Sequence, residues 1–231
     1  MAKPKIVVLT GAGMSAESGL KTFRDANGLW EGHDVMQVAS PEGFAKDPAL
    51  VLEFYNQRRR QLLQVSPNSG HRALTSLERW FDVDIITQNV DNLHEQAGSK
   101  KVLHLHGELL KARSTGDSNL ILDWHEDLNI GNLCPKGHQL RPHIVWFGEM
   151  VPQLEPAMSI TALADILIVI GTSMQVYPAA SLIHYTRPGI PIYFIDPKPN
   201  VDPKDFDNLT VLSKTATEGV PDLVEELAKA I

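Results

Sequence analysis

The chain has 231 residues and a formal net charge of −7, with 43% hydrophobic and 21% charged residues. These values are typical of a globular protein and exclude a disordered or fibrous class. The acidic balance argues against a general nucleic-acid binder, because neutralising phosphates requires an excess of Lys and Arg on one face. We therefore expect no nucleic-acid partner.

The sequence gives no sign of a membrane segment or an export signal. No apolar run approaches the roughly 18 residues that a membrane span requires, and no charged and apolar leader precedes Ile6. Cys134 is the one cysteine, which excludes an intrachain disulfide and fits a reducing compartment. We expect a monomeric cytoplasmic protein that makes no membrane contact.

Short apolar runs recur along the chain and predict the strands of a sheet that is covered on both faces. Helix-like stretches separate them, including HRALTSLERWF and a C-terminal stretch with Pro221 near its first turn. This alternation predicts an α/β fold with a doubly wound parallel sheet. The expected strands are residues 5–10, 83–89, 101–107, 165–173, 191–196 and 209–213.

Two segments interrupt the alternation and predict a second, smaller domain inserted into the first. Residues 30–65 are helical and loop-like without a strand, and residues 108–149 carry short polar runs such as GDSN and PKGHQ. Together these two segments would form the small module. Residues 1–29, 66–107 and 150–231 would form a discontinuous Rossmann-like domain.

The first expected strand leads into GAGMSAESG, where Gly11, Gly13 and Ala16 fit the pattern G-x-G-x-x-A. Such glycines let the backbone approach a pyrophosphate at a helix N-terminus; the alternative is an ordinary glycine-rich turn. A dehydrogenase also needs an acidic residue about 20 positions on, at the end of a second strand. TFRDANGLWEGHD occupies that region and predicts a loop. Hydride transfer is therefore disfavoured.

Polar residues follow the later strands as well. Gly171, Thr172 and Ser173 end one expected strand, and Asp196 ends another. In open α/β sheets, ligands bind at the carboxyl ends of the strands. We therefore expect these residues to face a ligand crevice.

TQNVDNLH and LHLHGE place Gln88, Asn89, Asp91 and His106 at strand ends, where they would face the same crevice. A histidine of near-neutral pKa is suited to take a proton from a hydroxyl group. A single histidine at a strand end is more often a structural hydrogen-bonding group, but the convergence of four polar residues favours a catalytic site.

Five motifs occur in an order and spacing that resemble a known family. They are GAGMSAESGLKTFRDANGLW, TQNVDNLH, LHLHGEL, RPHIVWFGE and IGTSMQVYPAA. The chain is similar in them to the sirtuins, the NAD-consuming protein deacylases, from about residue 5 to the C-terminus. This resemblance implies an inverted dinucleotide-binding sheet, a small helical and zinc module, and a cleft between them. NAD as co-substrate and an acylated lysine of a protein would enter the cleft from opposite sides.

The resemblance also implies roles for individual residues. His106 would be the general base, with Asn89 beside it in the catalytic pocket. The acyl oxygen would attack the ribose carbon as nicotinamide leaves, and His106 would then activate a ribose hydroxyl, so that O-acyl-ADP-ribose is released. The expected cofactor-binding residues are Gly11, Ala12, Gly13, Ser15, Ala16, Phe23, Arg24, Trp30, Gln88, Asn89, Asp91, Gly171, Thr172, Ser173, Asp196 and Ala216.

The resemblance makes Val145, Trp146 and Phe147 the edge on which the substrate peptide adds as a strand. Core packing is the alternative for Trp146 and Phe147. For Arg24 the alternative is a solvated loop charge.

The chain departs from the family at the zinc site. Most sirtuins bind zinc with two cysteine pairs, and a tetrahedral site needs four N or S ligands. Here Cys134 stands alone, Ser114 and Asp117 occupy approximately the first pair's places, and His138 adds at most one ligand. We therefore expect no bound metal. Packing would hold the module through Leu120, Ile121, Leu122 and Trp124.

DPALVLEFYNQRRRQLLQV predicts a helix with Leu50, Phe54, Gln57 and Gln61 on one side. An arginine run of this kind is most often a solvated face. However, Tyr55 lies three positions before Arg58 and four before Arg59, and both are neighbour spacings on a helix. A tyrosine hydroxyl and a guanidinium on one face can bind a carboxylate together. Spacing alone leaves the choice between the two arginines open.

The resemblance favours Arg58, because Tyr-x-x-Arg on this helix is the pattern of sirtuins that remove acidic acyl groups from lysine. Tyr55 and Arg58 would then be substrate-binding residues, and succinyl- and malonyl-lysine would be preferred over acetyl-lysine. Arg59 and Arg60 would be solvated surface.

Two other functions stay open on the sequence. One is NAD hydrolysis or ADP-ribosyl transfer, which some sirtuin-like proteins perform. The other is a catalytically idle module that binds NAD or acyl-lysine. Asn89, Asp91 and His106 argue against the idle module, because a binding module has no need of a base.

Overall fold

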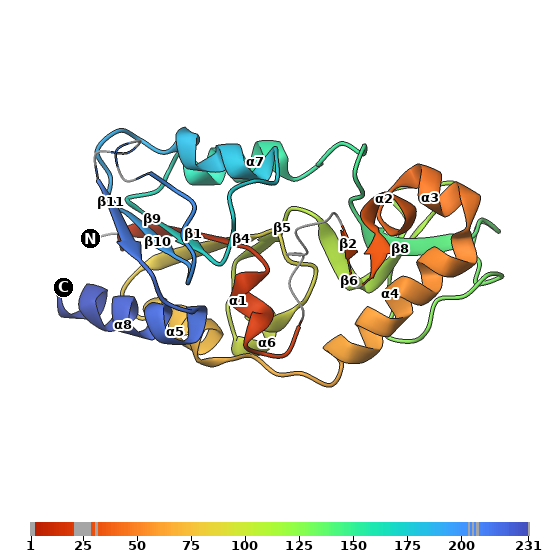
Figure 1. The fold of residues 1–231 in the computed structure, drawn as a ribbon, viewed down its shortest axis with the longest axis horizontal. Coiled ribbons are helices and arrows are strands. Elements are labelled where there is room, and N and C mark those ends of the chain that lie inside the picture. The colour runs from red at the N-terminus through yellow and green to blue at the C-terminus, as the bar shows by residue number, and fades with distance from the viewer. Residues whose placement is uncertain are drawn as a thin grey trace.

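The structure, a computed structural model, describes residues 3–20, 29–30, 32–202, 204, 206 and 208–230. A six-stranded parallel sheet forms the larger part of the molecule, and a three-stranded antiparallel sheet with helices beside it forms the smaller part (Figure 1). The predicted α/β class with a parallel sheet and a second, smaller part is confirmed. The strands of the large sheet are β1 (Lys5–Thr10), β4 (Asp82–Thr87), β5 (Val102–His104), β9 (Ile166–Ile170), β10 (Ile192–Ile195) and β11 (Leu209–Leu212).

The strand order of the large sheet is β11-β10-β9-β1-β4-β5. The chain therefore runs outward from β1 through β4 to β5, and then crosses to β9 and runs outward through β10 to β11. The direction reverses between β1 and β9, and such a switch point is where open α/β sheets bind their ligands. The order thus locates a ligand crevice before any side chain is considered.

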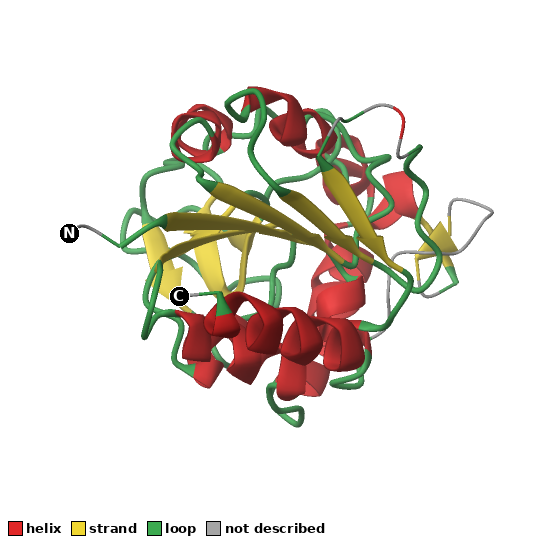
Figure 2. Cartoon of the chain, turned by 90° about the vertical axis from the view of Figure 1, so that its left-hand side faces the viewer, coloured by secondary structure: helices red, strands yellow, loops and turns green. Residues whose placement is uncertain are grey.

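Helices cover both faces of this sheet (Figure 2). Ile6 and Val8 of β1 pack towards α5 (Ser69–Leu77) and α8 (Ala216–Lys229), and Val7 and Leu9 pack towards α7 (Leu154–Thr161) and the 3-10 helix η1 (Ala179–Tyr185). Both alternating sets are buried, which explains why the strands are apolar at successive positions. The helices of the larger part are α1 (Gly13–Ala16), α5 (Ser69–Leu77), α6 (Leu93–Ala97), α7 (Leu154–Thr161), the 3-10 helix η1 (Ala179–Tyr185) and α8 (Ala216–Lys229).

The C-terminal helix begins earlier than predicted. α8 starts at Ala216 and holds Pro221 in its interior, so the expectation of Pro221 near the first turn is wrong. Glu17 accepts a hydrogen bond from the amide of Thr217 at 3.0 Å. A carboxylate at this position satisfies a free amide of the first turn, which the pattern of the helix alone does not reveal.

The smaller part lies at the far end of the molecule from both termini (Figure 1). Its sheet has the order β7-β6-β8. Trp30 pairs with His33 in a short antiparallel pair, so the expectation that residues 30–65 contain no strand is wrong. Its elements are β2 (Leu29–Trp30), β3 (His33–Asp34), α2 (Val35–Val38), α3 (Pro41–Lys46), α4 (Pro48–Leu62), β6 (Gly107–Ser114), β7 (Ile121–Asp123) and β8 (Leu140–Ile144).

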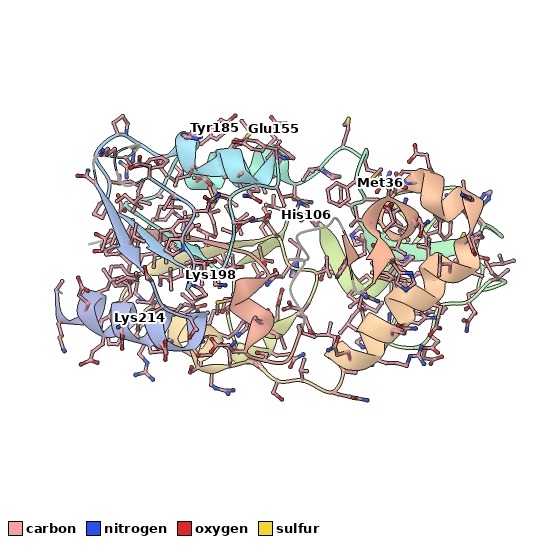
Figure 3. The ribbon with its side chains drawn as sticks, in the orientation of Figure 1. Met36, His106, Glu155, Tyr185, Lys198 and Lys214 are labelled. Carbon is pink, nitrogen blue, oxygen red and sulfur yellow. The ribbon has the colours of Figure 1, made fainter. Side chains whose placement is uncertain are left out.

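The expected strand over residues 101–107 is in fact the boundary between the two sheets. β5 ends at His104 and β6 begins at Gly107, whose φ is 82°. A Cβ atom on Gly107 would lie 2.0 Å from the carbonyl oxygen of His143, so only glycine fits there. This turn sets His106 between the parallel sheet and the smaller part (Figure 3).

The arginine run on α4 divides between core and surface. Arg60 is exposed and pairs with Glu53 at 2.6 Å. Arg59 is only 1% exposed and donates to the carbonyl of Leu109 and the side chain of Asn56, so its assignment to the surface is wrong. Burial lowers the pKa of Arg59 to about 10.

The buried face of α4 also differs from the prediction. Gln57, expected on the same side as Phe54, is exposed. The residues of this helix that are buried are Val51, Leu52, Phe54, Tyr55, Asn56, Arg59 and Leu62.

Polar pairs involve Ser114, Asp117 and Cys134, the residues that the sequence placed in the expected zinc region. Cys134 Sγ donates to the hydroxyl of Ser114 at 3.2 Å, and Asp117 pairs with Lys136 at 2.7 Å. Leu120, Leu122 and Trp124 pack into the adjacent core as expected, but Ile121 is exposed. Over the described part of the chain, no group of three or more His, Cys, Asp or Glu side chains is arranged to hold a metal ion.

Candidate functional site

A cleft of about 330 Å³ opens between the two parts of the molecule at the switch point of the large sheet. This volume lies in the usual range of small-molecule sites. The predicted residues that line the cleft are Gly11, Ala12, Ser15, Trp30, Tyr55, Arg58, Gln88, Asn89, Asp91, His106, Val145, Trp146, Phe147, Gly171, Thr172 and Ser173.

No helix among the described residues is long and apolar enough to cross a membrane.

One end of the cleft is formed by two glycine turns that touch each other. The amide of Gly13 donates to the carbonyl of Gly171 at 2.8 Å. A Cβ atom on Gly13 would lie 2.6 Å from the Cα atom of Gly171, and Gly171 itself has a φ of 60°. The turn after β1 and the turn after β9 therefore pack without any side chain between them, which brings backbone atoms to the cleft surface.

This end of the cleft fits a dinucleotide. The amides of Gly11, Gly13 and Ser15 all donate to carbonyl groups of the chain, whereas the amide of Ala12 has no recorded acceptor among the described residues. The glycines thus serve close backbone packing, and Ala12 and Ser15 beside them line the cleft.

Polar side chains from β4's end connect to both glycine turns. Asn89 donates from Nδ2 to the hydroxyl of Ser15 at 3.2 Å, and Gln88 donates to the hydroxyl of Thr172 at 3.2 Å. Asp91 is 6% exposed and accepts from the amide of Leu93. Burial raises the pKa of Asp91, while its hydrogen bonds act in the opposite direction.

His106 lies in the middle of the lining. Its Nδ1 atom is 3.1 Å from the carbonyl oxygen of Gln88. A carbonyl accepts only, so Nδ1 carries the proton and Nε2 of the neutral ring is left to accept one. Burial lowers the pKa of His106, and the bond to Gln88 raises it by less. The ring is therefore neutral near pH 7, as a general base requires.

Aromatic side chains and Arg58 line the opposite end of the cleft. Tyr55 is fully buried, and its hydroxyl accepts from Nε1 of Trp146 at 3.0 Å. Arg58 lies over the ring of Phe54 at 3.2 Å and over that of Trp30 at 5.3 Å, and it donates to the carbonyl of Phe54 at 2.5 Å. These contacts hold the guanidinium beside the buried tyrosine.

The backbone amides of the expected peptide edge are bonded within the chain, and the carbonyl of Trp146 accepts from the amide of Glu149 at 3.0 Å. Three successive amides already donate within the chain: Val145 to His106, Trp146 to Glu149 and Phe147 to Ala39. Trp146 is 2% exposed and Phe147 is 41% exposed. Trp146 is thus a core residue that also lines the cleft.

Four predicted cofactor residues do not line the cleft, and two lie outside the described residues. Gly13 packs behind Gly171, as described above. Asp196 is 1% exposed and accepts from the amide of Lys198, and Ala216 is 4% exposed at the start of α8. Ala16, Gly13, Asp196 and Ala216 are absent from the lining. Phe23 and Arg24 belong to residues 21–28, which the structure does not describe.

The structure adds lining residues that the sequence did not single out. Glu149 accepts from Arg141, Arg113 and the amide of Trp146, and thereby fixes the turn that follows β8. Its position in the motif RPHIVWFGE could have marked Glu149 as a candidate site residue. The other additional lining residues are Leu20, Ala39, Gln61, Leu62, Val90, Leu109, Ile144, Gly148, Val151, Val176, Tyr177 and Pro178.

Comparison with known proteins identifies the family. The model of the Sir2 family matches residues 11–178. A protein of Helicobacter pylori named NAD-dependent protein deacylase is 56% identical over 222 residues, which cover 96% of each chain. A protein of Bacteroides thetaiotaomicron with the same name is 53% identical over 231 residues, covering 97% of this chain and 98% of that protein. The chain belongs to the Sir2 family.

Solved structures agree with this assignment. A Sir2 homologue mutant in complex with ADP-ribose matches with a TM-score of 0.88 and 41% identity, over 99% of this chain and 93% of that one. A Sir2 homologue in complex with NAD matches with a TM-score of 0.86 and 40% identity, over 99% and 91% of the two chains.

Proposed function

We propose that this chain, an NAD-dependent protein deacylase of the Sir2 family, removes succinyl and malonyl groups from protein lysines and acetyl groups more weakly. The observation that carries the proposal is that Tyr55 and Arg58 line the same cleft as His106. A cation and a hydroxyl at one end of the cleft suit an acyl group that ends in a carboxylate.

The contacts of Tyr55 and Arg58 support an acidic acyl group. The Tyr55 hydroxyl accepts from Trp146, so its own proton is left for a further acceptor. Burial raises the pKa of Tyr55, which keeps that proton in place. Arg58 stands among aromatic rings, where little water competes, and a guanidinium makes strong charge-assisted bonds to a carboxylate.

The proposed reaction assigns a task to each group of lining residues. When bound, NAD supplies an electrophilic ribose carbon with nicotinamide as leaving group. Ala12 and Ser15 would hold phosphate, and Asn89 and Asp91 would hold ribose. His106 would then take a proton at Nε2 from a ribose hydroxyl, because its Nδ1 proton is engaged by the Gln88 carbonyl.

The peptide would bind along residues 145–147, where the carbonyl of Trp146 already accepts from the amide of Glu149. The amides of these residues donate within the chain, so the incoming strand would have to contribute its own N–H groups. Because this binding would use backbone groups, it would favour no particular substrate sequence. The proposal includes a monomer that acts in the cytoplasm without nucleic acid.

Arg58→Met tests the acyl preference. We expect kcat/KM for a succinyl-lysine peptide to fall about 10- to 100-fold, because a charge-assisted bond contributes about 1.5–3 kcal/mol. Deacetylation should change by less than about threefold. The measurement is product formation by mass spectrometry with NAD and acetyl-, malonyl-, succinyl- and glutaryl-lysine peptides.

Arg60→Met is the matched control. Arg60 lies on the same helix but is exposed and pairs with Glu53, so its loss should leave all four rates unchanged. Equal loss of desuccinylation and deacetylation in Arg58→Met would contradict the acyl preference. Nicotinamide release at the same rate without any peptide would favour an NAD hydrolase instead.

A further inference from the structure

The proposed mechanism makes no use of His104, a buried histidine close to the catalytic residues. Its Nδ1 atom lies 3.2 Å from the carbonyl oxygen of Asn89, and its Nε2 atom lies 2.7 Å from Oε1 of Glu95. Both partners are acceptors. A neutral imidazole carries one N–H, so it can satisfy only one of them, whereas an imidazolium donates to both. The imidazolium is therefore the form of His104 that satisfies both acceptors.

The position of this pair connects it to the catalytic pocket. His104 is the last residue of β5 and has a side chain that is 8% exposed, and Glu95 lies on α6 with a side chain that is 39% exposed. The carbonyl that His104 contacts belongs to Asn89, whose side chain lines the cleft and donates to Ser15.

Asn89 is held on both sides of its backbone. Its amide donates to the hydroxyl of Thr87 at 3.0 Å, and its carbonyl accepts from His104. The Thr87 hydroxyl is itself bonded to Thr10, which is bonded to His94. The amide side of Asn89 thus rests on a buried network, while its carbonyl depends on one partly exposed ion pair.

The charges around His104 support its protonation. Burial alone lowers the pKa of His104, but the bond to Glu95 and the charges of Glu95 and Glu108 outweigh burial and raise it. Asp91 adds a carboxylate, and His94 is kept neutral by burial. Among the described residues, the titratable and charged groups that face the pair are His71, Asp91, His94, Glu108 and Lys111.

We infer that His104 and Glu95 are positioning residues: the imidazolium fixes the carbonyl of Asn89 and so orients the side-chain amide of Asn89 in the cofactor pocket. The inference rests on the proposed role of Asn89. The reaction would then use two histidines in opposite protonation states. His106 is neutral and accepts a proton, and His104 is cationic and holds Asn89 in position. Activity should therefore rise with pH as His106 loses its proton and fall at higher pH as His104 loses its own.

Glu95→Gln tests the pair, because it removes the charge that holds the proton on His104 and leaves a side chain of the same size. Ring resonances of His104, followed by NMR against pH, should show its pKa lowered in the variant. The alkaline limb of kcat/KM for NAD should move to lower pH with it, and the acid limb should stay. On the alkaline side we expect kcat/KM for NAD to fall about tenfold, with KM for the acyl peptide unchanged.

Glu108→Gln is the control, since Glu108 acts on His104 through its charge but bonds to Lys111. It should move the same limb by less. A His104 ring that is neutral at pH 7 in the parent protein would overturn the inference, as would an alkaline limb that stays in place when the pKa of His104 falls.

A second readout separates this inference from the proposed function. A parent protein that binds NAD but transfers no acyl group would contradict the deacylase proposal only. In that case NAD affinity tests the inference, measured by calorimetry below and above the pH at which His104 loses its proton. Affinity that falls as His104 is deprotonated supports the pair, and affinity independent of its protonation overturns it.

Discussion

One end of the cleft is formed by backbone turns, and the other end is formed by side chains. At the end where we propose that NAD binds (the cofactor end), the turns containing Gly13 and Gly171 meet backbone to backbone, with no room for a Cβ atom on either. At the end where we propose that the acyl group binds (the acyl end), the side chains of Tyr55, Arg58 and Trp146 define the surface. The first end depends on how two strands of one sheet are spaced, and the second depends on which side chains one helix presents.

This difference has a consequence for how each end tolerates change. At the end where we propose that the acyl group binds, a substitution changes a side chain and leaves the backbone in place, so we expect acyl preference to be adjustable by single substitutions. The cofactor end has no such freedom, because an added methyl group must displace backbone. We therefore expect NAD affinity to respond to the volume added at the two glycine turns. Acyl preference should respond to the charge and the hydrogen-bonding groups of the side chains.

The largest expected effect comes from Gly13→Ala. The added Cβ atom would lie 2.6 Å from the Cα atom of Gly171, so the two turns must separate. We expect a loss of about 3 to 4 kcal/mol in the free energy of unfolding and about 100-fold in NAD affinity, measured by denaturant melts and calorimetry.

Gly137→Ala is the control for that substitution. Gly137 has a φ of 80° and open space around its Cβ position, and it is not part of the cleft lining. It should lower the free energy of unfolding by about 1 kcal/mol through backbone strain alone and leave NAD affinity unchanged. Equal NAD affinity in Gly13→Ala and the parent would break the proposed contrast between the two ends.

The next effect concerns a buried histidine behind the cofactor end. Burial lowers the pKa of His71 to about 4 from an ordinary value of 6.5. Between those values the unfolded chain takes up a proton that the folded chain does not, so the free energy of unfolding falls as pH falls through this window. The difference corresponds to about 3 kcal/mol below pH 4 and to nothing above about pH 7.

His71→Gln should flatten this dependence, and denaturant melts between pH 4 and 7 would measure it. Glutamine suits the position, because His71 accepts from the amide of Asn68 in a capping box where Gln is also favoured. His125→Gln, at an exposed site, should keep the parent's slope. The same slope in His71→Gln as in the parent would mean that other groups cause the acid destabilisation.

A smaller effect is expected for Tyr55→Phe at the acyl end. The change removes the hydroxyl but keeps the ring, and a hydrogen bond to a charged carboxylate contributes about 1.5 kcal/mol or more. Desuccinylation should fall about tenfold in kcat/KM while deacetylation stays within about twofold. Steady-state rates with both peptides would check this, and a loss of deacetylation alone would contradict the assigned contact.

The smallest expected effect is that of metal removal. Ser114 and Cys134 bond to each other, and Asp117 pairs with Lys136, in the region where the sequence led us to look for zinc ligands. Dialysis against a chelator should leave the melting temperature and the deacylation rate unchanged. One zinc per chain by elemental analysis, lost together with activity on dialysis, would show that this module does depend on metal.

The sequence predicted the parts that local patterns govern. Successive apolar residues such as Val7 and Val8 predicted a strand buried on both faces, and five ordered motifs pointed to the Sir2 family before any coordinates. Tyr55 and Arg58 stood at a helix-neighbour spacing, and both line the cleft. In each case the information lies within a few residues of chain, because strand and helix periodicity are local properties.

Other features depend on contacts between distant segments. Arg59 looks like its neighbours in sequence, but its burial follows from Leu109 and Asn56, which its guanidinium bonds. The break between His104 and Gly107 exists because the carbonyl of His143 leaves room for glycine only.

By itself, the sequence determined the family, the parallel sheet and the residue types of the cleft. Only the tertiary structure decided which arginine is buried, where the expected strand over residues 101–107 divides, and that His104 faces two acceptors at once. Periodicity gives the face on which a residue lies, but the partners it meets there come from segments that only folding brings together.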